Sequence, residues 1–230
     1  MAGITKDFKV TFHGNKSLII GVLNDDGTVK NPVWGTGLVS MDAMENSSES
    51  KAQYADDEVW TMTAGAPLLQ GSVTFMQMND DLRTDFFGQQ EVKATIGNTQ
   101  LTGYGDTGAY PQRILEYLIE GTATSKTDGS VQAAALLTVY PNAQVTSTPT
   151  KESETDTDDI SVVNWTAKIQ ATATDKFIVN GKKLPAVEFQ VIGDAEVAAL
   201  KKALADGSFI KLNANPSANS AASPAASPAA

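Results

Sequence analysis

Short stretches of alternating apolar and polar residues dominate this chain and predict a protein made mainly of β-strands. Phe8, Val10 and Phe12 alternate with polar residues, a pattern typical of a half-buried strand. A nearly continuous apolar run follows at residues 17–23 and ends in the turn-forming sequence Asn-Asp-Asp-Gly. Further strand patterns occupy residues 59–63, 71–78, 113–123, 131–140, 160–172, 177–179 and 182–190.

Turn sequences predict how some of these strands pair. Asn180-Gly181 separates two strand patterns by two residues and suits a type I′ turn, in which both central residues need a positive φ. An Asp-Gly step within residues 125–130 predicts a second, longer hairpin. The linker 64–70, which contains Gly and Pro, predicts that the strands on either side of it form a third pair.

Two short helices interrupt the strand pattern, at residues 79–87 and 194–205. Each begins at a residue whose side chain can cap free backbone N–H groups and is followed by a glycine suited to a left-handed stop. The capping and stopping residues are Asn79 and Gly88 for the first helix and Asp194 and Gly207 for the second. Each helix is expected to cover an open face or end of a sheet.

Three polar segments look poorly ordered when alone. Residues 41–57 are acidic, and residues 143–159 are rich in Thr, Ser and Asp. Both are as long as loops become in compact domains before they are functional or disordered. Residues 213–230 repeat Ala, Ser and Pro and cannot bury a core. The chain therefore divides into a β domain at 1–212 and a flexible tail or linker remnant at 213–230.

Composition narrows the functional classes. The 230 residues are 41% hydrophobic, carry a formal net charge of −10 and include no cysteine. A core is therefore possible, but disulfides and thiolate metal sites are excluded. No basic patch is visible, whereas a DNA-binding surface normally needs one. No apolar run is long enough to span a membrane. The start of the chain lacks an apolar signal-peptide region, so we expect synthesis in the cytoplasm.

Catalytic motifs are not visible. His13 is the only histidine, and we expect it at a strand end on the surface. Residues 103–108 match the spacing of a dinucleotide-binding glycine motif but do not lead into a helix, so a loop is predicted there. We therefore expect no enzyme activity and no cofactor.

Two binding alternatives remain open on the residues alone. Asp156, Asp158 and Asp159 resemble part of a calcium loop but lack its glycine and terminal glutamate, so a solvated acidic loop is favoured. The tryptophans could form an aromatic platform in a carbohydrate-binding or adhesin-like β-sandwich, although packed aromatics are commoner in sheets. The three are Trp34, Trp60 and Trp165.

The order of the parts is more informative than any single motif. The sequence YADDEVW leads into a strand, and a later strand is followed by a short helix ending in Phe-Phe-Gly. A long central hairpin, a Thr/Glu/Asp-rich loop and the strand WTAKIQATA come next. Over residues 1–192 this order resembles the major tail protein family of long-tailed, non-contractile phages that infect Gram-positive bacteria.

The resemblance implies a structural subunit of a phage tail tube. Its fold would be a β-sandwich or split barrel with one or two short flanking helices and long polar loops. Subunits would form stacked hexameric rings around a bore through which double-stranded DNA passes without specific binding. Further partners would be the tape measure, tail terminator and distal tail proteins. The protein would reside in the virion tail, and in the host cytoplasm during assembly.

On this interpretation the polar loops reach neighbouring subunits, and we expect the contacts to come from two sets of side chains. The bore itself would be either acidic, repelling DNA, or neutral, with the acidic residues facing outward for solubility. The contact residues expected are Glu45, Ser50, Tyr54, Asp56 and Asp57 in the first loop and Thr150, Glu152, Asp156, Asp158 and Asp159 in the second.

Overall fold

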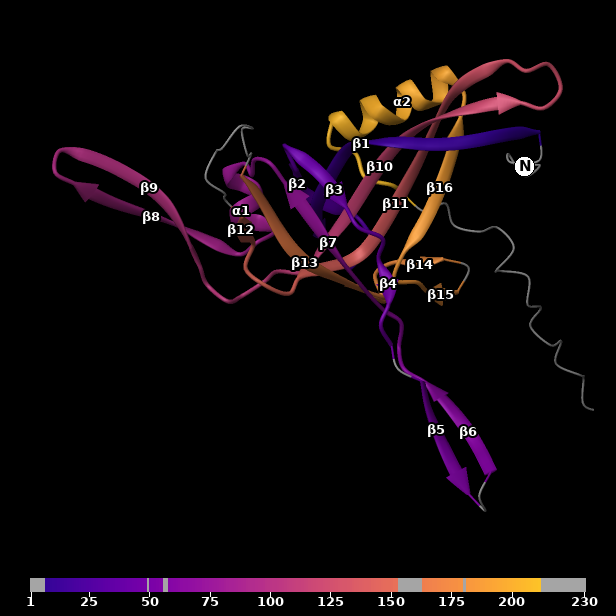
Figure 1. Cartoon of the computed structure of the whole chain (residues 1–230), viewed down its shortest axis with the longest axis horizontal. Coiled ribbons are helices and arrows are strands. Elements are labelled where there is room, and N and C mark those ends of the chain that lie inside the picture. The colour runs from indigo at the N-terminus through magenta and orange to yellow at the C-terminus, as the bar shows by residue number, and fades with distance from the viewer. Residues whose placement is uncertain (1–6, 49, 56–57, 153–162, 180, 212–230) are drawn as a thin grey trace, which may run out of the picture.

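The computed structural model describes residues 7–48, 50–55, 58–152, 163–179 and 181–211, and it confirms a mainly β fold. Strands make up most of the described residues, and the two helices make up a small part. A large antiparallel sheet curls into a half-barrel, with two short helices packed on it (Figure 1). Its seven main strands follow the order β2 (Val29–Trp34), β1 (Phe8–Leu23), β10 (Arg113–Ser125), β11 (Val131–Val145), β13 (Asn164–Thr172), β7 (Leu68–Phe75) and β3 (Leu38–Met41).

Shorter strands extend this sheet, and three two-stranded ribbons stand outside it. β16 (Val187–Ile192) pairs with β11, β12 (Thr150–Glu152) with β13, and β4 (Glu45–Asn46) with β7. The ribbons are β5 (Ser50–Ala55) with β6 (Glu58–Ala64), β8 (Gln89–Ile96) with β9 (Thr99–Asp106), and β14 (Ile178–Val179) with β15 (Lys182–Lys183).

The sheet curls because β11 serves two neighbours along one edge. Its first half pairs with β16 through Ala134–Val139, and its end pairs with β13 through Ala143–Val145. Pro141 lies between these two stretches and has no backbone N–H to donate to a ladder. The ladder is therefore interrupted there, and β13 and β7 turn away from the plane of β1 and β10 (Figure 1).

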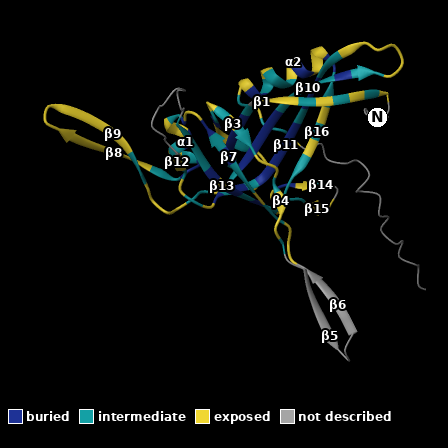
Figure 2. Ribbon diagram, in the orientation of Figure 1, coloured by how far each residue is buried: buried dark blue, intermediate teal, exposed yellow. Residues whose placement is uncertain are grey.

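Two apolar cores hold this arrangement together. The first lies inside the curl, where Phe75 of β7 meets Phe86 and Phe87, which follow helix α1 (Asp80–Asp85). The ring centroids of Phe86 and Phe87 are 5.3 Å apart, and those of Phe75 and Phe87 are 6.1 Å apart, both in edge contact. The second core lies between the sheet and helix α2 (Asp194–Ala205), which buries Val197 and Leu204 (Figure 2).

Both helices confirm the sequence prediction, with a different cap in one. Asn79 holds the N-cap position of α1 but makes no side-chain cap hydrogen bond. The N-cap of α2 is Gly193, not Asp194 as predicted. The carboxylate of Asp194 instead accepts a hydrogen bond from the backbone N–H of Ala133, at 2.7 Å, which ties the helix to the start of β11. Gly88 has the expected positive φ, of 61°.

Two of the three predicted hairpins form. Strands β10 and β11 pair up to Thr124 and Val131, on either side of the predicted Asp-Gly turn. Strands β14 and β15 pair around Gly181, whose φ is 74°, whereas Asn180 lies outside the described residues. The strand predicted at 182–190 is split, because the chain leaves β15 before Pro185 and joins the main sheet as β16.

The third predicted hairpin is wrong. Strand β6 pairs with β5, and β7 pairs with β13 and β3. Residues 41–57 are therefore more than a loop, because they include β4 and β5. The β5–β6 ribbon leads away from the body (Figure 1). Strands must alternate apolar and polar residues where one face covers a core, and a ribbon that leaves the body is free of that requirement.

Strand β1 runs through the position predicted as a strand end. His13 and Gly14 lie within it, at an irregularity where the pairing with β10 shifts register. Gly14 has a φ of 77°, which only glycine adopts readily. His13 is exposed, so the prediction of a surface residue is correct although its position in the strand was not.

Gly88→Ala is expected to destabilise the fold more than Gly129→Ala. Both glycines have positive φ, 61° and 74°, but an added Cβ at Gly88 would lie 2.1 Å from the carbonyl oxygen of Ala109, whereas none lies within 4 Å at Gly129. Gly129→Ala, the control, should lower the free energy of unfolding by about 1–2 kcal/mol through backbone strain alone. Urea unfolding measures both variants, and equal losses would contradict the steric explanation.

Candidate assembly surfaces

One face of the sheet formed by β7, β13, β12 and the end of β11 is lined by uncharged polar side chains. Inward-facing neighbours such as Phe75 and Ile169 are buried in the first core. Because alternate residues of a strand point to opposite sides, the intervening positions share the outer face. In register across the strands lie a row of amides, Gln144, Gln170 and Gln70, and a row of hydroxyls, Thr150, Thr166, Thr74 and Ser40.

Hydrogen bonds join side chains within these rows. The amide of Gln170 donates to the Oε1 of Gln144 at 3.3 Å, and the hydroxyl oxygens of Thr74 and Thr166 are 3.0 Å apart. Lys168 is aligned with Ser72, whose hydroxyl donates to Asp42. We call the outer face built on these rows the polar sheet face. Charged side chains border the rows: Lys168 and Asp42 lie beside Ser72, and Glu45 is aligned with Gln70.

The β8–β9 hairpin is a two-sided ribbon that projects from the body (Figure 1). Val92, Ala94 and Ile96 share one face with Leu101, because Ala94 lies opposite Leu101 in the ladder. Glu91, Lys93 and Thr95 point to the other face. Figure 2 shows both strands as largely exposed towards the tip. The hairpin therefore presents an uncovered apolar face and a solvated polar face.

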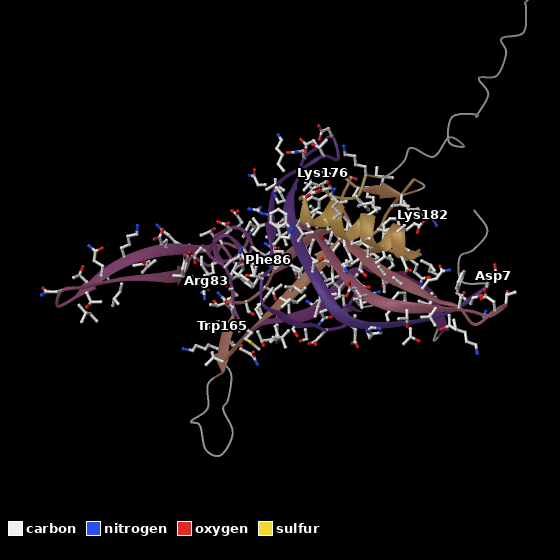
Figure 3. All side chains as sticks on the ribbon, turned by 90° about the horizontal axis from the view of Figure 1, so that it is seen from above. Asp7, Arg83, Phe86, Trp165, Lys176 and Lys182 are labelled. Carbon is white, nitrogen blue, oxygen red and sulfur yellow. The ribbon has the colours of Figure 1, made fainter. Side chains whose placement is uncertain are left out.

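Contacts at its base fix the hairpin to the body. The guanidinium carbon of Arg83 lies 5.0 Å from the ring centroid of Tyr104 in β9 and 5.8 Å from that of Trp165 in β13. The same guanidinium donates to the Oε1 of Gln89 at 3.3 Å. In Figure 3, Arg83 and Trp165 lie on the side of the body from which the hairpin emerges. The base is thus anchored while the tip makes no such contacts.

The β8–β9 hairpin was not predicted from the sequence. Residues 103–108 were predicted as a loop, but Gly103 and Gly105 belong to β9, and only Gly108 adopts a positive φ. A usable signal was present. Gly97-Asn98 separates two alternating segments by two residues, and Gly97 has a φ of 59°. The glycines in β9 masked the alternation on that strand.

The predicted contact residues fall in two places. Glu45 is exposed on β4, opposite Gln70, and Ser50 and Tyr54 lie on β5. Thr150 and Glu152 form β12, and Thr150 belongs to the hydroxyl row of the polar sheet face. The first group thus follows the β5–β6 ribbon and its base, and the second borders the polar sheet face. The remaining five, Asp56, Asp57, Asp156, Asp158 and Asp159, lie outside the described residues.

Two of the three tryptophans considered for an aromatic platform make contacts within the subunit. The indole N–H of Trp34 donates to the carbonyl of Leu204 at 3.2 Å, and Trp165 packs against the first core. The side chain of Trp60 is outside the described part of the chain.

Among the described residues, no three His, Cys, Asp or Glu side chains are grouped to hold a metal ion. Neither described helix has the length and apolar character needed to cross a membrane.

Glu116 is an ionisable group buried in the second core, with 1% of its surface exposed. Its Oε1 accepts a hydrogen bond from the backbone N–H of Ile210 at 2.8 Å, which fastens the segment after α2 to β10. Its Oε2 has no partner among the described residues. Burial raises the pKa of this carboxyl from 4.5 to about 7, because the charged form is poorly solvated there.

Glu116→Gln is expected to stabilise the protein at neutral pH. The pKa of Glu116 is higher in the folded than in the unfolded state, so the wild type is most stable below about pH 4.5, where the carboxyl is protonated in both states. This contribution to stability is lost as the pH rises through about 7. The shift corresponds to about 3 kcal/mol of folding free energy, as an upper bound. Urea unfolding from pH 4 to 8 measures the difference, with Glu91→Gln controlling for removal of a carboxyl. Parallel profiles for Glu116→Gln and wild type would contradict the prediction.

The sequence of the chain is similar to those of known proteins over nearly its whole length. A family model described as phage tail tube protein matches residues 1–216. Curated tail tube proteins of Lactococcus phages F4-1, p2 and SK1 are each 34% identical to the chain over 205 residues. These alignments cover 86% of the chain but 66% of each relative. The chain therefore spans just under two thirds of the length of the relatives it matches.

Proposed function

The chain belongs to the phage tail tube protein family, and we propose on that premise that it assembles into stacked hexameric rings whose bore carries the genome during ejection. Family membership confirms the resemblance. A structural rather than enzymatic role in the virion tail is part of the proposal, and the description of the relatives as tail tube proteins supports it. The ring symmetry, the stacking and the passage of DNA are our proposals.

The polar sheet face is the observation that carries the conduit role, because its chemistry suits the wall of a bore. Neutralised phosphates dominate the affinity of proteins for DNA, so a wall with few cations gives a sliding duplex few places to stick. Amides and hydroxyls that are hydrogen-bonded to one another, as in Gln144 with Gln170 and Thr74 with Thr166, have less capacity left for the duplex. The two uncharged rows are what favours the neutral bore over the acidic one, although Lys168, Asp42 and Glu45 lie beside them.

Closure into a ring is consistent with the open edges of the sheet. The main sheet ends at β2 on one side and at β3 and β4 on the other. Exposed strand edges invite uncontrolled pairing, and joining the sheets of neighbouring subunits into a closed barrel removes them. Such a barrel would place the polar sheet face around the bore and helix α2 on the outer wall.

We assign contacts between stacked rings to the β5–β6 ribbon and those beside the bore to β12 and the segment after it. The first comprises the region of Glu45, Ser50, Tyr54, Asp56 and Asp57, and the second that of Thr150, Glu152, Asp156, Asp158 and Asp159. The division into a domain at 1–212 and a tail at 213–230 also remains a proposal, because residues 212–230 lie outside the described part. The tape measure, tail terminator and distal tail proteins are the further partners proposed.

Electron microscopy of the purified chain tests this function. We expect rings or tubes in negative stain, with a matching high-mass fraction in size-exclusion chromatography. A protein that stays monomeric at all concentrations and is retained on a glycan column would instead favour the carbohydrate-binding alternative. Purified tubes should not retard duplex DNA in a gel, and tight, salt-sensitive retardation would contradict passive passage.

A further inference from the structure

The segment after helix α2, residues 207–211, lies against the main sheet, and we call it the strap. It starts at Gly207, whose φ of 76° turns the chain directly after the helix. The ring of Phe209 lies against β1 at Gly21, where an added Cβ would be 2.9 Å from its Cζ atom. Phe209 and Ile210 are both partly buried against the second core. The strap therefore packs two apolar side chains on the same core as α2.

In the described part of the chain, one hydrogen bond joins the strap to the sheet. The backbone N–H of Ile210 donates to the Oε1 of Glu116 in β10 at 2.8 Å. Glu116 is 1% exposed, and its Oε2 has no partner among the described residues. In register, Glu116 lies between Ile19 of β1 and Val139 of β11, which both belong to the second core. The strap is thus fastened at a carboxyl group whose apolar neighbours cannot solvate its charged form.

The protonation of Glu116 is controlled mainly by burial. Burial is the larger cause of its raised pKa, and the hydrogen bond from Ile210, which favours the charged form, offsets only part of the rise. Two of the charged groups on the surrounding elements are engaged elsewhere, Lys201 with Glu120 and Lys176 with Asp25. The charged groups on the elements around Glu116 are those of Lys201, Lys202 and Asp206 at the end of α2, Glu120 on β10, Asp26 and Lys176 in the loops beside the strap, and Lys211 in the strap itself.

We propose that Glu116 and the strap form a proton-controlled latch, in which the strap stays on β10 while the carboxyl is protonated and detaches when it ionises. Detachment lets water solvate the ionised carboxylate, which the closed strap prevents. A pocket of about 390 Å³ is lined by Ile210 and Lys211, so solvent has a path to this end of the core once Ile210 moves. The latch thereby controls how the chain beyond residue 211 is joined to the domain, and it does not depend on ring symmetry or stacking.

Hydrogen exchange of the full chain, followed by mass spectrometry on the peptide that contains the strap, tests the latch. The measured quantity is the protection factor, the intrinsic exchange rate at each pH divided by the observed rate. The pKa of Glu116 is about 7 with the strap closed and returns to about 4.5 once water reaches the carboxyl. The protection factor of the strap should therefore fall roughly fiftyfold between pH 5 and pH 8.

Glu116→Gln keeps the shape of the side chain but cannot ionise, so its protection factor should not change over this range. Glu91→Gln, on an exposed position of β8, is the matched control and should behave like the wild type. A wild-type protection factor that is independent of pH would overturn the proposal. An equal fall across the β10–β11 ladder would also overturn it, because the titration would then belong to unfolding of the whole domain.

A reciprocal measurement leaves Glu116 unchanged. Phe209→Ala removes the ring that packs at Gly21 and should loosen the strap, so the titration midpoint of Glu116 should fall from about 7 towards 4.5. Carbon-13 NMR of the glutamate carboxyl groups measures this midpoint, with the signal assigned through its loss in Glu116→Gln. Lys211→Ala, at an exposed position of the strap, is the control and should leave the midpoint in place. An unchanged midpoint in Phe209→Ala would show that the strap does not bury the carboxyl and would overturn the latch.

Discussion

Replacement of the β5–β6 ribbon, residues 50–64, by a short Gly-Ser linker is expected to abolish tube formation while the subunit keeps its fold. The strands of this ribbon pair only with each other, so its removal breaks no ladder of the main sheet. A long ribbon that shares no described backbone ladder with the main sheet is suited to contact another subunit.

Thermal unfolding and electron microscopy together measure this result. The variant should unfold within a few degrees of the wild type and give no tubes at concentrations where the wild type assembles fully. Replacing residues 125–130, the turn between β10 and β11, by a linker of equal length is the matched control. Tubes of normal length from the ribbon variant would show that β5 and β6 are not needed for stacking.

Gln70→Lys combined with Gln170→Lys is expected to slow genome ejection several-fold while tubes still form. The two glutamines are aligned in the amide row of the polar sheet face. If the rings are hexameric, the pair adds about twelve cations to each ring of the bore, and each cation near a phosphate strengthens DNA binding. The retardation should weaken as ionic strength rises, because salt screens these contacts.

Ala199→Lys, on an exposed position of α2, is the control for added positive charge. Virions carrying it should eject at the wild-type rate, since α2 is assigned to the outer wall. The comparison is made by following DNA release in virions assembled with each variant. Equal ejection rates in the glutamine variant and wild type would contradict the placement of the polar sheet face at the bore.

Local sequence signals identified the parts of the fold that depend on neighbouring residues. The Asp-Gly turn between β10 and β11 and both helices lie where the sequence predicted them. At the β10–β11 turn, hydrogen bonds from Ser125 and Ser130 lower the pKa of Asp128 to about 2, so the turn is stabilised by its own side chains. Such features form within a few residues, and sequence patterns report them directly.

Pairing between distant strands could not be read from the same signals. The run at 59–63 alternates like any strand, but whether it joins β7 or β5 depends on which partner covers its faces. The continuity of β1 through His13 and Gly14 likewise depends on β10 alongside it. The N-cap of α2 is Gly193 and not Asp194 as predicted, because the Asp194 carboxylate accepts a hydrogen bond from the backbone N–H of Ala133, 61 residues away along the chain.

The sequence by itself determined the mainly β class, the acidic and cysteine-free character and, through the order of its parts, the tail tube family. Tertiary structure alone decided the surfaces. Gln144, Gln170 and Gln70 are far apart in the chain and form one row only because three strands align in register. The apolar face of the β8–β9 hairpin could be recognised only once the cores had been seen to bury the other apolar residues. Burial is a property of the whole fold, so which apolar residues remain exposed cannot be known until every other one has been placed.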